Sequence, residues 1–164
     1  MFREMRRNRQ KMDAAACVCL LNNGTSGVLA VNGEDGYPYT IPLNYIYEDG
    51  KLYFHGAKSG HKIDAILKDA KVSFCVIGME QNVPEKFTVH FKSVVVFGKA
   101  VIVENDTERR QAIRRLADRY SPDESNEKRD AEITREWKSL TVIRVDIEYM
   151  SGKQAIELVK EREG

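Results

Sequence analysis

The spacing of apolar residues changes several times in the first third of the chain, and each change predicts a new element. Apolar residues at helical spacing predict a helix over 9–22, which Asn23-Gly24 would end. Three strand-like segments follow at 26–31, 37–47 and 51–55. Turn residues at 32–36 and Glu48-Asp49-Gly50 separate them, and the second turn is typical of a tight hairpin.

The rest of the chain alternates between the two kinds of spacing less regularly. It predicts a helix over 59–68, a strand over 71–78, a polar loop over 79–86 and a long strand over 87–104, with Gly98 as a bulge or barrel corner. Two further helices are expected at 106–120, capped by Asp106 or Thr107, and at 124–137. A last strand over 140–150 would end at Ser151-Gly152, followed by a short tail.

This order predicts an α+β fold, because hairpins come early and helices late. Helices do not separate the strands regularly, which disfavours a doubly wound parallel sheet. A six-stranded antiparallel split β-barrel with flanking helices closes such strands without exposed edges. We expect a single domain over 1–164, with residues 1–8 mobile.

Composition adds few constraints. A hydrophobic content of 42% and a charged content of 31% are ordinary for a globular protein, and a net charge of +1 gives no general attraction to nucleic acid or membranes. The basic start favours a solvated segment over a nucleic-acid-binding arm; its basic residues are Arg3, Arg6, Arg7, Arg9 and Lys11. Between Asp106 and Lys138, nine acids balance nine bases, which suggests a solvated face.

Location and metal binding are also constrained. No apolar run approaches the ~20 residues of a membrane span, and no apolar segment follows the basic start as in a signal peptide. Cys17-Val18-Cys19 lacks a second ligand pair for zinc, so no metal is expected. Buried thiols in a reducing cytoplasm are the simplest interpretation of the three cysteines, so we expect a cytoplasmic protein.

The most informative chemistry lies at the predicted turn from strand to helix, His55-Gly56-Ala57-Lys58-Ser59-Gly60-His61-Lys62. Free backbone N–H groups and basic side chains at a helix start suit a phosphate. A lysine in the first helical turn is unfavourable against the helix dipole, which favours a nearby anion. Solvated lysines remain the alternative on this evidence alone.

Three segments together carry a resemblance to a known family. They are Gly-Tyr-Pro-Tyr-x-x-Pro-Leu-Asn at 36–44, the turn at 55–62, and Lys-Ser-Val-Val-Val-Phe-Gly-Lys-Ala at 92–100. In this order, over roughly residues 9–155, the chain resembles the flavin-nucleotide-binding branch of the pyridoxamine 5'-phosphate oxidase-like split barrels. Within that branch it is most similar to the Nim-type, nitroimidazole-resistance-related proteins.

The resemblance implies a homodimer with two FMN sites at the subunit interface. The flavin ring would lie over a strand segment whose backbone bonds its pyrimidine edge: Thr40, Ile41, Pro42, Leu43 and Asn44. The remaining cofactor contacts would be Gly56 and Ala57 at the ribityl chain, Lys58 and Lys62 at the phosphate, and Lys92 and Ser93 from the long strand. His55 would lie at the ring, either as a structural donor or as a catalytic proton donor.

Two departures from the oxidase itself bear on activity. His61 stands where the oxidase has an arginine beside the helix lysine, and no counterpart of its C-terminal substrate segment follows Leu140. Pyridoxamine phosphate oxidation is therefore not expected, and Trp137 is expected in the core or an interface.

The function expected from these features is that of an FMN-dependent oxidoreductase. It would pass electrons or hydride to a small acceptor such as a nitro compound, with NAD(P)H as a candidate donor and no nucleic-acid or membrane partner. The alternative is a non-catalytic module that binds or stores flavin, deazaflavin or haem. A dimer that has lost its ligand is disfavoured by the basic turn.

Overall fold

In the computed structural model, which describes residues 1–163, one antiparallel sheet runs in the order β3-β2-β6-β7-β8-β5-β4, and β1 pairs with β8. Gly164, the last residue of the predicted domain, lies outside the described residues. The strands are β1 Lys11–Met12, β2 Ser26–Asn32, β3 Pro38–Asn44, β4 Ile46–Glu48, β5 Lys51–Ala57, β6 Lys71–Val83, β7 Thr88–Ile102 and β8 Leu140–Gln154. The helices are α1 Ala14–Asn23, α2 His61–Lys68, α3 Asp106–Tyr120, α4 Asn126–Glu136 and α5 Ile156–Glu163, with short 3₁₀ turns at Asn8–Gln10, Glu34–Gly36 and Pro84–Lys86.

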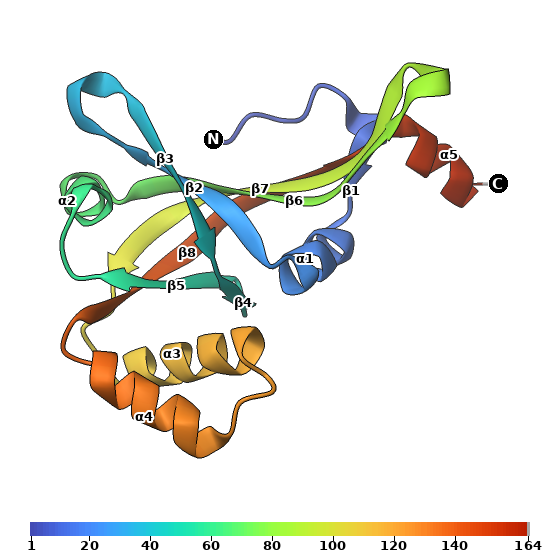
Figure 1. Cartoon of the computed structure of the whole chain (residues 1–164). Helices are drawn as coiled ribbons and strands as arrows, with labels where there is room; N and C mark the ends of the chain where they lie inside the picture. Colours follow the sequence, from blue (N-terminus) through green and yellow to red (C-terminus); the bar gives the residue numbers. More distant parts are fainter. Residues whose placement is uncertain (164) are drawn as a thin grey trace.

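The sheet curls because its two end strands, β3 and β4, follow one another in the chain and only Tyr45 separates them (Figure 1). Tyr45 is fully buried, and its hydroxyl donates to the backbone oxygen of Leu21 (2.7 Å). Its N–H donates to the hydroxyl of Tyr120 (3.0 Å) instead of to a neighbouring strand. The α+β antiparallel class is thus confirmed. The sheet has eight strands and not six, because the predicted strand 37–47 divides at Tyr45 and β1 was not foreseen.

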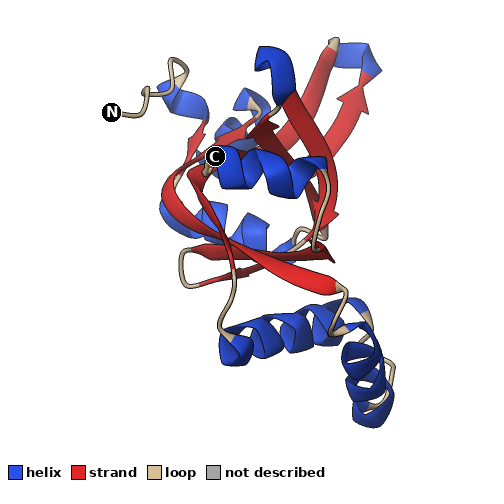
Figure 2. Ribbon diagram, turned by 90° about the vertical axis from the view of Figure 1, so that its left-hand side faces the viewer, coloured by secondary structure: helices blue, strands red, loops and turns tan. Residues whose placement is uncertain are grey.

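Alternating residues of the same strands fill two cores. Leu52 and Phe54 of β5 point into the barrel, whereas Tyr53 between them packs against α3 and α4. Ile143 and Val142 of β8 divide in the same way. The helical hairpin of α3 and α4 therefore covers the outside of β4, β5 and β8, as Figure 2 shows below the sheet.

Capping explains where the helices begin. The predicted helix over 9–22 starts only at Ala14, because Asp13 accepts a hydrogen bond from the N–H of Ala16 (2.7 Å) and Lys11–Met12 pair with β8. For α3 the predicted caps are wrong. Asn105 caps the helix, accepting from the N–H of Glu108 (2.9 Å).

Two predicted breaks are absent. The expected polar loop 79–86 continues β6 to Val83, since a register shift after Ile77 absorbs the irregularity and pairing with β7 resumes. Gly152 does not end β8. A Cβ there would collide with Met12 and Cys17, so this glycine permits close packing of β1 and α1, and the strand runs on to Gln154 before α5.

The bulge expected at Gly98 is confirmed by a register shift between β7 and β8 at that position. The three cysteines are free, but Cys19 is exposed and only Cys17 is buried. Trp137 packs at the edge of the outer core beneath Arg109, whose guanidinium lies 3.9 Å from the ring centre. No helix within residues 1–163 is long and apolar enough to cross a membrane.

Candidate functional site

The end of β5 and the start of α2 form a corner in which a lysine lies over a glycine. A Cβ added to Gly56 would sit 2.9 Å from the Nζ of Lys62. The missing side chain therefore makes room for the ammonium group against the β5 backbone. Gly56 and Lys62 are six positions apart in the sequence, and the turn between β5 and α2 brings them together.

The side chain of Lys62 is half-buried. Burial lowers the pKa of Lys62, because the charged form loses water. None of the ion pairs formed within residues 1–163 involves it. A bound anion would restore the favourable environment of this charge.

The N-terminus of α2 adds backbone donors to the same corner. No side chain caps this helix, and the N–H groups of Ile63 and Asp64 both turn back to the oxygen of Gly60 (2.8 and 3.1 Å). The N–H groups of His61 and Lys62 in the first turn have no helical partner. Together with the ammonium group they form a donor set that suits a phosphate.

A ring stack fixes the start of α2 beside β3. The imidazole of His61 lies parallel to the ring of Tyr39, with centres 4.1 Å apart and planes 13° apart. His61, which stands where the oxidase has an arginine beside the helix lysine, thus links the start of α2 to β3. The stack places the free donors of α2 next to the first residues of β3.

His55 lies between this corner and a cavity. Its side chain is exposed, yet the surrounding protein and the charge of Lys62 lower its pKa, so the imidazole is neutral at pH 7. A neutral imidazole can donate at one ring nitrogen and accept at the other.

One row of backbone groups of β3 is free. The N–H of Gly33 donates to the oxygen of Tyr37 (3.0 Å), and this pair continues the register of β2 and β3. Hydrogen-bonded and non-bonded pairs alternate in such a ladder, so the backbone groups of Thr40, Pro42 and Asn44 point away from β2. Because β3 ends the strand path within residues 1–163, these groups face an open edge.

Ile41 and Leu43, the other two predicted ring contacts, turn their side chains toward the barrel core. The predicted ribityl contact Ala57 is the exposed last residue of β5, and the predicted phosphate contact Lys58 is exposed directly after it. The side-chain amide of Asn44 donates to the oxygen of Thr25 (2.9 Å), which leaves its backbone groups at the edge.

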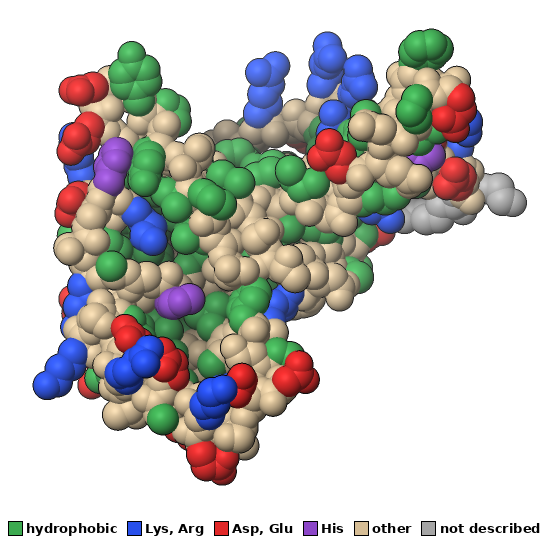
Figure 3. Space-filling model, in the orientation of Figure 1, with side chains coloured by type: hydrophobic (Ala, Val, Ile, Leu, Met, Phe, Trp, Pro, Cys, Tyr) green, Lys and Arg blue, Asp and Glu red, His purple; other side chains and the backbone are tan. Residues whose placement is uncertain are grey.

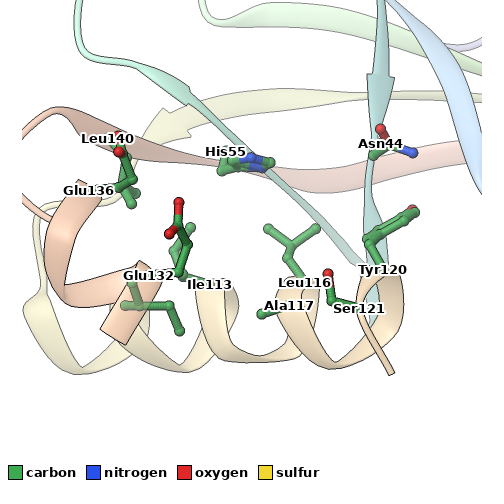
Figure 4. A pocket seen from close by; sticks show the side chains of 11 residues that line it. Asn44, His55, Ile113, Leu116, Ala117, Tyr120, Ser121, Glu132, Glu136 and Leu140 are labelled. Carbon is green, nitrogen blue, oxygen red and sulfur yellow. The ribbon is translucent and has the colours of Figure 1, made fainter. Parts of the chain in front are cut away.

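A cavity of about 300 Å³ opens beside His55 and Asn44. In Figure 4 these two side chains reach it from the strands, and Ile113, Leu116 and Ala117 of α3 face them from below. Its other lining residues are Tyr120, Ser121, Glu132, Ile133, Glu136 and Leu140. This pocket joins the predicted ring strand to the predicted catalytic histidine.

The cavity wall formed by α3 and α4 was not predicted from the sequence. The segment 106–138 was expected to be a solvated face because its charges balance. Arg114 does pair with Asp118 and Asp130 away from the cavity, but Glu132 and Glu136 line it. The signal was present in the helical spacing of Ile113, Leu116 and Tyr120, which marks an apolar stripe.

Lys92 and Ser93 are not brought to this site within one chain. They lie in β7 near the end of the sheet that α1 and α5 cover, whereas α2 lies at the other end (Figure 1). Lys92 lines a different recess together with Cys19, Gln154 and Leu158. A site built from one chain would lack both residues.

Comparison with known proteins gives the family. The family model described as pyridoxamine 5'-phosphate oxidase matches residues 13–154, and the chain belongs to this family. No curated protein sequence gives a significant match.

Solved structures agree with this assignment. A candidate 5-nitroimidazole antibiotic resistance protein from Bacteroides thetaiotaomicron matches with a TM-score of 0.73 and 21% identity, over 88% of this chain and 86% of that chain. A FAD-binding protein from Mesorhizobium loti matches at 0.62 and 26%, over 88% and 96%. A FAD- and haem-binding protein from Mycobacterium smegmatis matches at 0.71 and 17%, over 94% and 80%. Likenesses this distant establish the split-barrel fold and not the activity.

Proposed function

We propose that this protein is a flavoprotein that binds FMN at the corner of β3, β5 and α2 and acts as an oxidoreductase on a small acceptor. The observation that carries the proposal is Lys62, half-buried over Gly56 beside the free N–H groups of α2. A lysine in this setting can form a charge-assisted hydrogen bond with a phosphate, and FMN carries a terminal phosphate.

The free edge of β3 supports the position of the ring. Its outward backbone groups include the N–H groups of Thr40 and Asn44 and the C=O of Pro42. Such a mixture of donors and acceptors matches the pyrimidine edge of a flavin. FMN would supply the two-electron chemistry when bound, and His55 would hold a proton at a ring nitrogen next to the acceptor.

A homodimer is part of the proposal, and an open sheet face supports it. Cross-strand neighbours Pro42, Val28 and Cys75 share this face with Ile77, and Val28 and Ile77 are 40% and 62% exposed. Figure 3 shows hydrophobic side chains gathered in the middle of the molecular face that carries β2 and β3. A second copy on this face would bring its own Lys92 and Ser93 toward the flavin.

The experiment that tests the function is anaerobic spectroscopy of the purified chain with FMN. We expect a perturbed flavin spectrum, bleaching by NADH or NADPH, and recovery of the oxidised spectrum when a nitroaromatic compound is added. The oxidoreductase would be refuted if FMN binds, neither NADH nor NADPH bleaches it, and dithionite-reduced FMN on the protein is not reoxidised by the nitroaromatic compound. A flavin-binding protein would then remain.

A second candidate function is non-catalytic binding of FAD, deazaflavin or haem. The observation that favours it is the fold match to the FAD- and haem-binding protein of Mycobacterium smegmatis and to the flavocytochrome Anf3 of Azotobacter vinelandii. Haem bound at stoichiometric level would appear as a Soret band, which FMN alone does not give.

A further inference from the structure

The cavity beside His55 has apolar walls and no cationic side chain. Its lining residues come from the five elements β3, β5, α3, α4 and β8. Four of them are buried members of the outer core: Ile113, Leu116, Ile133 and Leu140. At about 300 Å³ it is at the small end of ligand-binding pockets, which suits one aromatic ring with a short substituent.

Two carboxylates set the charge of this cavity. Glu132 and Glu136 are exposed residues of α4, and Figure 4 shows them at the same end of the cavity as Leu140. Arg135 pairs with both from outside the lining, so three charges sum to one negative charge at the rim. His55, the one lining imidazole, is neutral at pH 7 and does not offset it.

An anion entering this cavity would lose water without gaining a cationic partner, and it would meet the rim carboxylates. A neutral or cationic ring of the same size would pack against the apolar walls without the cost of burying an unpaired negative charge. Lys62 and Lys58 do not line the cavity, so the proposed phosphate corner does not supply the missing charge.

We propose that this cavity binds the electron acceptor and selects small aromatic compounds that are neutral or cationic over anionic ones, with Glu132 and Glu136 as the residues that set this preference. The inference rests on the proposed flavin site, because His55 links the two. It also implies that the phosphate-bearing substrate after which the family is named fits this cavity poorly.

The experiment uses the FMN-loaded protein and three probes with one shared core: 4-nitrobenzyl alcohol, 4-nitrobenzylammonium and 4-nitrobenzoate. Dissociation constants are measured by perturbation of the oxidised flavin spectrum, without turnover. We expect 4-nitrobenzoate to bind at least tenfold more weakly than the other two at low ionic strength. Added salt should narrow this ratio, because the rim charges are exposed.

The double variant Glu132→Gln, Glu136→Gln should reduce the ratio of the dissociation constant of 4-nitrobenzoate to those of the other two probes at least threefold. The control Asp123→Asn changes an exposed carboxylate outside the cavity and should leave this ratio unchanged. Equal affinity for all three probes in the wild type would overturn the inference. An altered FMN affinity in the double variant would also overturn it, since the cavity would then hold the flavin ring. Failure to bind FMN at all is recorded in the loading step and refutes the proposed function instead.

Discussion

The positive charge of Lys62 is partly buried, which costs free energy unless an anion binds next to it. The Gly56 backbone beneath it and the free N–H groups of α2 beside it form a setting that a substitution can test residue by residue. His55 feels the same charge, which couples the proposed phosphate contact to the proposed proton donor.

Removing both lysines should weaken FMN binding without unfolding the chain. For Lys58→Ala with Lys62→Ala we expect at least a tenfold increase in the FMN dissociation constant, about 1.4 kcal/mol, because charge-assisted contacts are lost. Lys68→Ala, at the far end of the same helix, is the matched control. Unchanged affinity in the double variant would show that the phosphate binds elsewhere.

The pKa of His55 should report the charge of Lys62. We expect its NMR titration midpoint below 6.5, and a rise toward 6.5 in Lys62→Gln or on addition of FMN, whose phosphate offsets the lysine. Because the folded state takes up this proton less readily than the unfolded chain, the stability linked to His55 is complete above pH 6.5 and falls as the pH drops below it. A titration midpoint of His55 that lies at or above 6.5 and does not change in Lys62→Gln would contradict the coupling between these two residues.

At the scale of elements, the helical hairpin is held to the barrel by the last turn of α3. The hydroxyl of Tyr120 lies 2.7 Å from the oxygen of Thr25 and 2.6 Å from that of Tyr45, and it accepts the N–H of Tyr45. Arg119 adds a bond to the oxygen of Asn22 at the end of α1 (2.7 Å). Tyr120 is also one of the residues that line the cavity.

Tyr120→Phe should therefore destabilise the fold by about 1–3 kcal/mol, because the N–H of the buried Tyr45 loses its acceptor. Urea unfolding followed by circular dichroism measures the change. Tyr37→Phe, at a side chain that is 76% exposed, should leave the unfolding midpoint where it is. Equal midpoints for both variants would mean that the hydroxyl does not anchor α3.

The sequence predicted elements well where local signals decide and less well where pairing decides. The spacing of α3 could be predicted because it depends on nearby residues. The Gly98 bulge could be predicted because a glycine inside a strand is a local mark of a bulge, although the partner strand β8 is distant in the sequence. The break at Tyr45 could not, because a strand-like run ends there only through contacts with Leu21 and Tyr120. Gly152 misled in the same way, since its role depends on β1 and α1.

At the scale of the whole molecule, the exposed face of β2, β3 and β6 should be the dimer contact. Ile77→Glu places a charge on this face at a side chain that is 62% exposed, so the fold should tolerate it while the dimer dissociates. Sedimentation velocity of the variant beside Leu67→Glu, a 70% exposed position on α2, checks this. A monomeric wild type would rule out the dimer.

The candidate site could be predicted only in part, because some of its residues meet only through tertiary packing or through a second chain. Motif residues of the turn, Gly56 and Lys62, meet because they flank one tight connection. The wall from α3 and α4 joins them only through tertiary packing, and Lys92 with Ser93 would join only through a second chain. Helical spacing marks the apolar stripe of α3 but does not say which residues the stripe faces, and it carries no information about a second chain.

The proposed function depends above all on a nucleotide phosphate that binds at the corner of β5 and α2. Its most direct test is a comparison of FMN with riboflavin, which lacks the phosphate, by titration against the wild-type chain. We predict that FMN binds at least tenfold more tightly than riboflavin, and that this difference disappears in Lys62→Ala. Equal binding of the two flavins by the wild type would contradict it.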